Sequence, residues 1–154
     1  MAAPTMSYLI CSVGLIVLII AMPVFYSIER DNIANRIAES ELTEIADYTS
    51  NTLSNLYFLA NSTDNANINL TKQLVYLPLT VQGSFYKITI ESVDEEASKI
   101  TASFTDRPSI SSDSWLVPGL KVGNSYSVES SSKKIFANCF RNEAGFFISV
   151  VNGV

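Results

Sequence analysis

Histidine is absent from this chain of 154 residues, and cysteine, glycine and proline are scarce. Without histidine, the commonest general base and metal ligand is missing. The sequence also contains no glycine-rich phosphate loop, no nucleophile elbow and no paired-cysteine motif. It therefore predicts neither an enzyme nor a metal site, and it calls for no cofactor.

The two cysteines, Cys11 and Cys139, lie far apart in the sequence. Cys11 is in a strongly apolar segment, and Cys139 is in a region with strand-like alternation. A disulfide needs Cα atoms within about 7 Å of each other, which this layout disfavours. We expect both to be small buried hydrophobic residues rather than reactive thiols.

Basic side chains are outnumbered, with 10 Lys and Arg against 15 Asp and Glu, for a net charge of −5. Residues 29–61 hold six acidic and two basic side chains and carry −4, whereas residues 62–154 carry −1. Nucleic-acid binding requires clustered Lys and Arg. We therefore expect no nucleic acid contact.

Charged side chains are also absent from residues 1–28, and residues 8–28 are almost wholly apolar. A helix of about 21 residues at 1.5 Å each spans about 31 Å, enough to cross the hydrocarbon core of a bilayer. A cleaved secretory signal is disfavoured, because no basic residue precedes the run and the run is too long. Two interpretations stay open: a membrane anchor, and a helix first held in the membrane and then moved into the core of a filament.

One proline interrupts this apolar segment. Pro23 removes the helical hydrogen bond to the carbonyl of Ile19, and its ring crowds that carbonyl, so we expect a helix kink or a loosened turn there. Ser12 and Gly14 are small enough to let a second helix approach closely, although such residues are common in membrane helices in any case.

From Asp31 onward, apolar residues recur every three or four positions, as in an amphipathic helix. No glycine or proline interrupts residues 24–60, and the polar residues 61–65 favour an end to the helix. The apolar stripe must meet lipid, its own head or copies of the chain. We predict two domains, a hydrophobic and amphipathic helix over residues 1–61 and a β-rich extracellular head over residues 62–154. A fragment that starts near Asn65 is expected to fold alone as a soluble monomer.

The head has the alternation and turn residues of short antiparallel strands. We expect strands at residues 84–91, 99–105, 126–129, 133–139 and 145–151, with an edge or bent strand at 73–80 because of Pro78. Residues 92–98 would close a hairpin, and residues 111–124 form a long loop with at most one short strand. The inward-facing residues of the hairpin are expected to be Tyr86, Ile88, Ile90, Ile100, Ala102 and Phe104. The fold class is α+β, a long N-terminal hydrophobic α-helix followed by a small antiparallel β-sandwich or curled sheet.

The sequence gives conflicting evidence about the side of the membrane on which the head lies. Arg30 and Arg36 follow the apolar segment, which by the positive-inside rule weakly favours a cytoplasmic head. The glycosylation sequons at Asn61 and Asn69, each followed two residues later by threonine, favour an exported head. We place the head outside, with Asn61 and Asn69 as glycosylation candidates. A basic leader removed ahead of the first residue would resolve the conflict.

The order of a membrane-length helix, an amphipathic extension and a β head resembles that of type IV pilins, above all the archaeal branch of pilins and archaellins. The uncharged start Tyr8-Leu9-Ile10-Cys11-Ser12-Val13-Gly14-Leu15-Ile16-Val17 is similar to mature archaeal pilin helices. The resemblance implies an immunoglobulin-like head and a helical homopolymer. Its helices would bundle in the core, and its heads, often glycosylated, would cover the surface. The assembly residues that follow are Tyr8, Leu9, Val13, Leu15, Ile16, Val17, Ile19, Ile20, Val24, Ile28, Ile33, Ile37, Ile45, Leu53 and Leu56.

Two features of the family are not found in this sequence: a short basic leader ending in Lys/Arg-Gly, and the glutamate of bacterial relatives near the mature N-terminus. Two other readings stay open. One is a single-pass membrane-anchored surface protein, similar to the archaellum stator components that grip a surface-layer protein. The other is a minor pilin that primes or tips a filament. In each reading the chain is inserted in the membrane through its N-terminal helix, at least before assembly.

Two local features carry weaker hypotheses. Asp94-Glu95-Glu96 has oxygen ligands that suit calcium, but its spacing matches no ordered loop, so a solvated turn is expected. Trp115 is expected to pack in the core or between molecules, with a ligand platform as the alternative.

Overall fold

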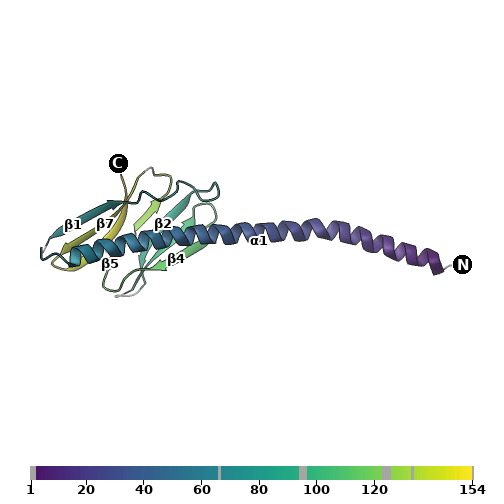
Figure 1. Ribbon diagram of the computed structural model, residues 1–154, viewed down its shortest axis with the longest axis horizontal. Helices are drawn as coiled ribbons and strands as arrows, with labels where there is room; N and C mark the ends of the chain where they lie inside the picture. Colours follow the sequence, from purple (N-terminus) through teal and green to yellow (C-terminus); the bar gives the residue numbers. More distant parts are fainter. Residues whose placement is uncertain (1–2, 66, 94–96, 123–125, 133, 154) are drawn as a thin grey trace. The chain divides into compact units, whose positions relative to one another are not determined.

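The computed structural model describes residues 3–65, 67–93, 97–122, 126–132 and 134–153 (Figure 1). The chain divides into two compact units, Met1–Ile37 and Ala38–Val154, named here the N-terminal unit and the head unit. One helix, α1 (Ala3–Asn61), contributes residues to both. The sequence placed the division after residue 61. The head unit starts earlier because the C-terminal part of α1 is buried in its core.

The fold class predicted from the sequence is confirmed: one long apolar helix precedes a two-sheet β-sandwich. Eight strands follow α1 within the described residues. They are β1 (Ile68–Gln73), β2 (Tyr86–Ser92), β3 (Ser98–Phe104), β4 (Ser111–Trp115), β5 (Lys121–Val122), β6 (Tyr126–Glu129), β7 (Ile135–Asn142) and β8 (Gly145–Asn152).

Each sheet has four strands. One has the order β1-β7-β8-β5 and the other β4-β3-β2-β6. All pairs are antiparallel except β5 with β8. The predicted hairpin is formed by β2 and β3, with Ile88 opposite Ala102 and Ile90 opposite Ile100. The alternation of the sequence fixes this register, because a slip of one residue would turn every apolar side chain to solvent.

The core lies between the sheets and the C-terminal part of α1. As predicted, the alternate residues of the hairpin point inward, and their side chains are at most 1% exposed: Tyr86, Ile88, Ile90, Ile100, Ala102 and Phe104. The helix closes the core with a stripe whose members recur every three or four residues, with Ala46 beside Ile45: Ala38, Leu42, Ile45, Ala46, Thr49, Leu53, Leu56 and Ala60. One-sided burial of this kind is what an amphipathic helix requires.

Two strand predictions were wrong. Residues 74–80 form no strand; the first strand is β1, which ends at Gln73, one residue before Leu74. Pro78 cannot donate to a ladder, and its carbonyl instead accepts a hydrogen bond from the buried Tyr86 hydroxyl, at 2.7 Å. The supposed long loop at residues 111–124 contains two strands, β4 and β5.

A tight turn lies between residues 74–80 and β2. Val81 and Ser84 exchange two backbone hydrogen bonds across Gln82-Gly83. Gln82 and Gly83 have φ values of 47° and 80°. Positive φ at both central positions marks a type I′ turn, and glycine at the second removes the steric cost there.

Candidate functional site: an exposed apolar helix surface

The N-terminal unit consists of one helical segment whose large apolar side chains are exposed. Among the described residues, only α1 has the length and composition to cross a membrane, and the apolar window that qualifies it is entirely unburied. No charge occurs before Glu29, so the segment has no polar face to turn toward water. At about 25 cal/mol for each Å² of apolar surface, such exposure strongly favours lipid or another protein surface.

The structure leaves most of the predicted assembly residues exposed on this segment, each at least 49% exposed: Tyr8, Leu9, Val13, Leu15, Ile16, Val17, Ile19, Ile20, Val24, Ile28, Ile33 and Ile37. They surround the helix rather than lining one side of it. A surface of that kind needs contacts on every side, as lipid or a bundle of helices provides.

Three other predicted assembly residues have a different environment. Ile45, Leu53 and Leu56 belong to the core of the head unit, with 4%, 0% and 7% of their surface exposed. Their side chains are already covered by the head's own residues. The surface left for assembly therefore ends near Ile37.

Helix α1 continues through Pro23. Around that position Pro23, Tyr26, Ser27 and Ile33 line a shallow surface groove with the charged pair Glu29 and Arg30. Further toward the N-terminus, the hydroxyl of Ser12 donates to the carbonyl of Leu9, which satisfies it inside an apolar stretch. A Cβ at Gly14 would meet no atom within 4 Å, so its surface is open. The expected kink at Pro23 stays a prediction.

Polar contacts fix the helix to strand β4 in the head unit. The hydroxyls of Thr43 and Ser112 share a hydrogen bond of 2.7 Å. About two helical turns further on, the Ser50 hydroxyl donates to the carbonyl of Trp115 at 2.8 Å. These bonds hold the helix along β4, the edge strand of its sheet.

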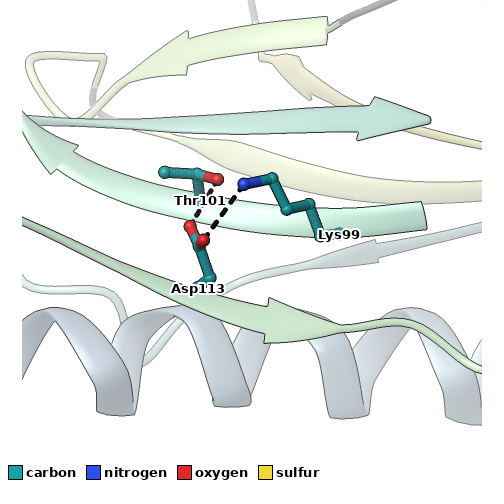
Figure 2. Close-up of polar contacts among 3 residues, drawn as sticks. All are labelled: Lys99, Thr101 and Asp113. Atoms are coloured by element: carbon teal, nitrogen blue, oxygen red, sulfur yellow. Dashed lines mark hydrogen bonds and ion pairs between the residues drawn. The ribbon is translucent and has the colours of Figure 1, made fainter. Parts of the chain in front are cut away.

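The outer face of the same sheet carries a small polar cluster, drawn in Figure 2. Asp113 on β4 accepts a hydrogen bond from the Thr101 hydroxyl on β3 at 2.6 Å and an ion pair from Lys99 at 3.0 Å. The Thr101 hydrogen bond, together with Lys99, holds the pKa of the Asp113 carboxyl below its usual 3.8, against the opposing effect of partial burial. The cluster joins two neighbouring strands and is partly open to solvent, so it contributes to stability rather than to chemistry.

The two cysteines are both free. Cys11 is exposed on the N-terminal unit and Cys139 is buried on β7. The burial predicted for both therefore holds for Cys139 only. Burial raises the pKa of the Cys139 thiol to about 11, which keeps it protonated and unreactive at neutral pH.

The sequons lie at two different places in the head unit. Asn61 is the last residue of α1, and Asn69 is the second residue of β1; both are exposed. The Thr71 hydroxyl donates to the side-chain oxygen of Asn138 at 3.3 Å on the neighbouring strand β7. Both asparagines are thus open to modification from solvent.

Trp115 is 62% exposed, so the expected core position is wrong, and packing between molecules or a ligand role stays a hypothesis. Tyr76, at 84% exposed, leans edge-on against Tyr48 with ring centroids 5.9 Å apart. This pair borders an open groove of about 480 Å³, whose other lining residues are Glu41, Glu44, Ile45, Leu77 and Pro78.

The outer face of the β1-β7-β8 sheet holds aromatic residues that the sequence reading passed over. Phe140 and Phe147 stack with ring centroids 5.3 Å apart and an angle of 14° between the planes. Phe136 lies on the same face of β7, four residues earlier. The alternation of Phe136, Asn138 and Phe140 with buried residues could have predicted this face.

Within the described residues, no three His, Cys, Asp or Glu side chains come together as metal ligands. The suggested calcium site at Asp94-Glu95-Glu96 lies outside the described residues. No protein-family model matches the chain, and comparisons with curated proteins and with solved structures gave no match.

Proposed function

We propose that this chain is a structural, pilin-like subunit of an extracellular filament. Helical segments of many copies form the core of the filament and β heads form its surface. The observation that carries the proposal is the apolar surface of residues 8–28, which is exposed on all sides of the helix. In a bundle of copies every side of that helix meets another apolar helix, and the membrane takes the same role before assembly.

The rest of the proposal follows from this arrangement. The polymer consists of this chain alone, its heads lie outside the cell, and Asn61 and Asn69 are open to glycosylation. The chain acts through assembly rather than catalysis, which agrees with a sequence that lacks histidine and any recognised catalytic motif.

Substitution of Ile16 by aspartate tests the bundle. Ile16 is 55% exposed in the single chain, so the change leaves the head intact, but it would place an unpaired charge inside a dry bundle at a cost of several kcal/mol. Cells that make the Ile16→Asp variant should release no filaments on shearing, as judged by electron microscopy.

The matched control is Asn51→Asp, which adds the same charge at an exposed position of the head unit and should leave filaments normal. Normal filaments from Ile16→Asp cells would contradict the bundle. Sheared fractions of the wild type in which this chain is not the main mass would contradict the filament itself.

A second function is favoured by one specific observation. The stripe of Ile45, Leu53 and Leu56 is satisfied inside its own head, as a single membrane-anchored surface protein requires. In that case residues 8–28 remain in the bilayer, and a surface-layer protein is a suitable partner for the head. Extraction of the wild type only by detergent, as a monomer and with no material in the sheared fraction, would select this function.

A further inference from the structure

A row of side chains crosses the outer face of one sheet of the head unit. Asn69 on β1 lies directly opposite Phe140 on β7, and Phe140 lies directly opposite Phe147 on β8. Residues directly opposite each other point to the same side of a sheet with Cβ atoms about 4.5–5.5 Å apart. A sequon asparagine therefore has Phe140 directly opposite it on the neighbouring strand, and Phe140 stacks in turn on Phe147 one strand further on.

The sequon carries its two required side chains on one exposed face of an edge strand. Strand β1 is the edge of its sheet, and its backbone is extended. Asn69 and Thr71 are two residues apart, so both side chains lie on the outer face, and both are exposed. An oligosaccharyltransferase needs the asparagine amide and the hydroxyl at the third position together, and this strand presents them side by side.

The two phenylalanines are not explained by the core. Phe140 and Phe147 alternate with the buried residues Cys139 and Ile148, so their rings lie on the solvent side of the sheet, where both are half-buried and stack on each other. Aromatic rings carry negative charge on their faces. A pyranose ring has one face of C–H groups, which are weakly positive, and it stacks well on such a surface.

We propose that Asn69 is an N-glycosylation site whose first sugar lies against the ring of Phe140, the member of the Phe140–Phe147 pair opposite Asn69. In the transfer, the Asn69 amide nitrogen forms a bond to C1 of the sugar and loses a proton to the transferase. The bond from C1 to a lipid-linked phosphate breaks, and the phosphate leaves with the bonding electrons. The inference depends on the proposed function only in needing an exported head, and it does not require a filament.

Mass spectrometry on the full chain tests the modification itself. The chain is made in a eukaryotic secretory host that attaches glycans through N-acetylglucosamine, and it is purified in detergent. The peptide containing Asn69 should carry a glycan, and the Asn69→Gln variant should lose it. An unmodified Asn69 in a preparation whose Asn61 is modified would overturn the proposal.

Thermal unfolding tests the contact with the rings, after an endoglycosidase has trimmed the glycan to one N-acetylglucosamine. Relative to Asn69→Gln, the sugar should raise Tm by roughly 2–6 °C, and its ring protons should shift upfield in proton NMR spectra. In Phe140→Leu, which keeps an apolar side chain without an aromatic face, both effects should fall by at least half.

The control for that variant is Phe136→Leu. It removes a ring from the same face of β7, opposite Gln73 and away from Asn69, and should leave both effects intact. An equal rise in Tm in wild type and Phe140→Leu would overturn the stacking. These results stand or fall independently of filament formation, which is measured separately by electron microscopy.

A free carbohydrate is the other source of the same chemistry, and a separate arm distinguishes it. The Asn69→Gln variant is titrated with soluble N-acetylglucosamine oligomers. We expect no saturable binding, because one pair of rings gives little affinity without covalent attachment. Saturable binding that is lost in the variant Asn69→Gln/Phe140→Leu would assign this face to recognition of free sugars and overturn the proposal.

Discussion

The apolar residues of α1 are exposed in one part of the helix and buried in the other. In the N-terminal unit Ile16 and Ile20 are 55% and 65% exposed, whereas in the head unit Leu42 and Leu53 are completely buried. The first part has no charged residue before Glu29 and therefore no polar face. The second alternates apolar residues with Glu39, Glu44 and Asp47 and can satisfy its apolar side against one surface.

One continuous helix can therefore contain two segments with different structural roles. The part after Ala38 is a structural element of the head, and its residues are as much core as those of the hairpin. The part before it has no partner within its own unit and must find one elsewhere. A boundary drawn from helix ends alone hides that change.

The largest expected effect comes from moving the start of the chain. A fragment of residues 38–154 should be a soluble monomer that melts cooperatively, because it keeps the whole core and loses the exposed apolar surface. A fragment of residues 65–154 should fail to fold, contrary to the expectation from the sequence. It lacks the buried stripe from Ala38 to Ala60, and marginal stabilities of 5–15 kcal/mol do not absorb such a loss.

Circular dichroism and gel filtration of the two fragments give the answer. If the shorter fragment melts cooperatively at the same temperature as the longer one, the helix does not contribute to the stability of the head. The buried and the exposed parts of α1 would then not differ in their structural role.

The next effect is on thiol reactivity. At pH 8 a pKa of about 11 leaves about one Cys139 thiol in a thousand ionised, and the side chain is fully buried, so labelling requires unfolding of the head. Cys11 is exposed in the single chain. A small apolar maleimide that enters the micelle should therefore modify Cys11 alone in detergent, as read by mass spectrometry of the two peptides.

The same experiment on membranes and on sheared fibres sharpens the comparison, since lipid or other copies should then protect Cys11 from water-soluble reagents. Rapid labelling of Cys139 in the folded chain would show that the head is far looser than its burial indicates.

A smaller effect is expected from shortening one side chain in each part. Leu53→Ala should destabilise the head unit by about 2–5 kcal/mol, because it leaves a cavity in a packed core. Ile16→Ala should leave the unfolding midpoint of the head unchanged within about 0.5 kcal/mol. Denaturant titration of the full chain in detergent measures both. Equal effects would mean that the two segments share one cooperative core.

The smallest effect concerns the polar cluster on the outer sheet. The pKa of Asp113 is lowered in the folded state, so its contribution to stability is present above the ordinary value of 3.8 and is lost as the pH falls through the folded value. Asp113→Asn should cost less than about 1 kcal/mol at pH 7, because the cluster is partly exposed.

The difference between wild type and Asp113→Asn should shrink as the pH falls below 4, which thermal melts in acid buffers would measure. Thr101→Val should reproduce most of this pH-dependent loss of stability, since the Thr101 hydrogen bond is the largest cause of the lowered pKa of Asp113. A constant difference from pH 7 to pH 2 would contradict the assignment.

The sequence predicted the architecture well where its pattern was long or strongly alternating. The helix, the β2–β3 hairpin and strand β6 were found because their apolar residues follow a period of 3.6 or 2. It failed between residues 68 and 80, where Leu74, Val75 and Leu77 suggested a strand that Pro78 excludes. Strand β1 was missed because Ile68 and Leu70 are its only two apolar residues, and Lys72 then ends the alternation.

The exposed apolar surface was predictable from composition alone, but its end near Ile37 was not. Ile33 and Ile37 continue the same spacing as Leu42 and Ile45, and nothing local distinguishes them. The division depends on where the sheets end, which is a property of contacts far apart in the sequence. The pairing of Asn69 with Phe140 is hidden for the same reason, since register between strands 71 residues apart is not written in either strand.

The order of the strands has a consequence for synthesis. Strand β8 lies between β7 and β5 near the middle of its sheet, yet it is the last strand along the chain. The sheet cannot close until β8 has left the ribosome, whereas residues 8–28 emerge well before β8 does. Any insertion or export machinery that recognises the apolar segment therefore acts on a nascent chain whose sandwich has not yet formed.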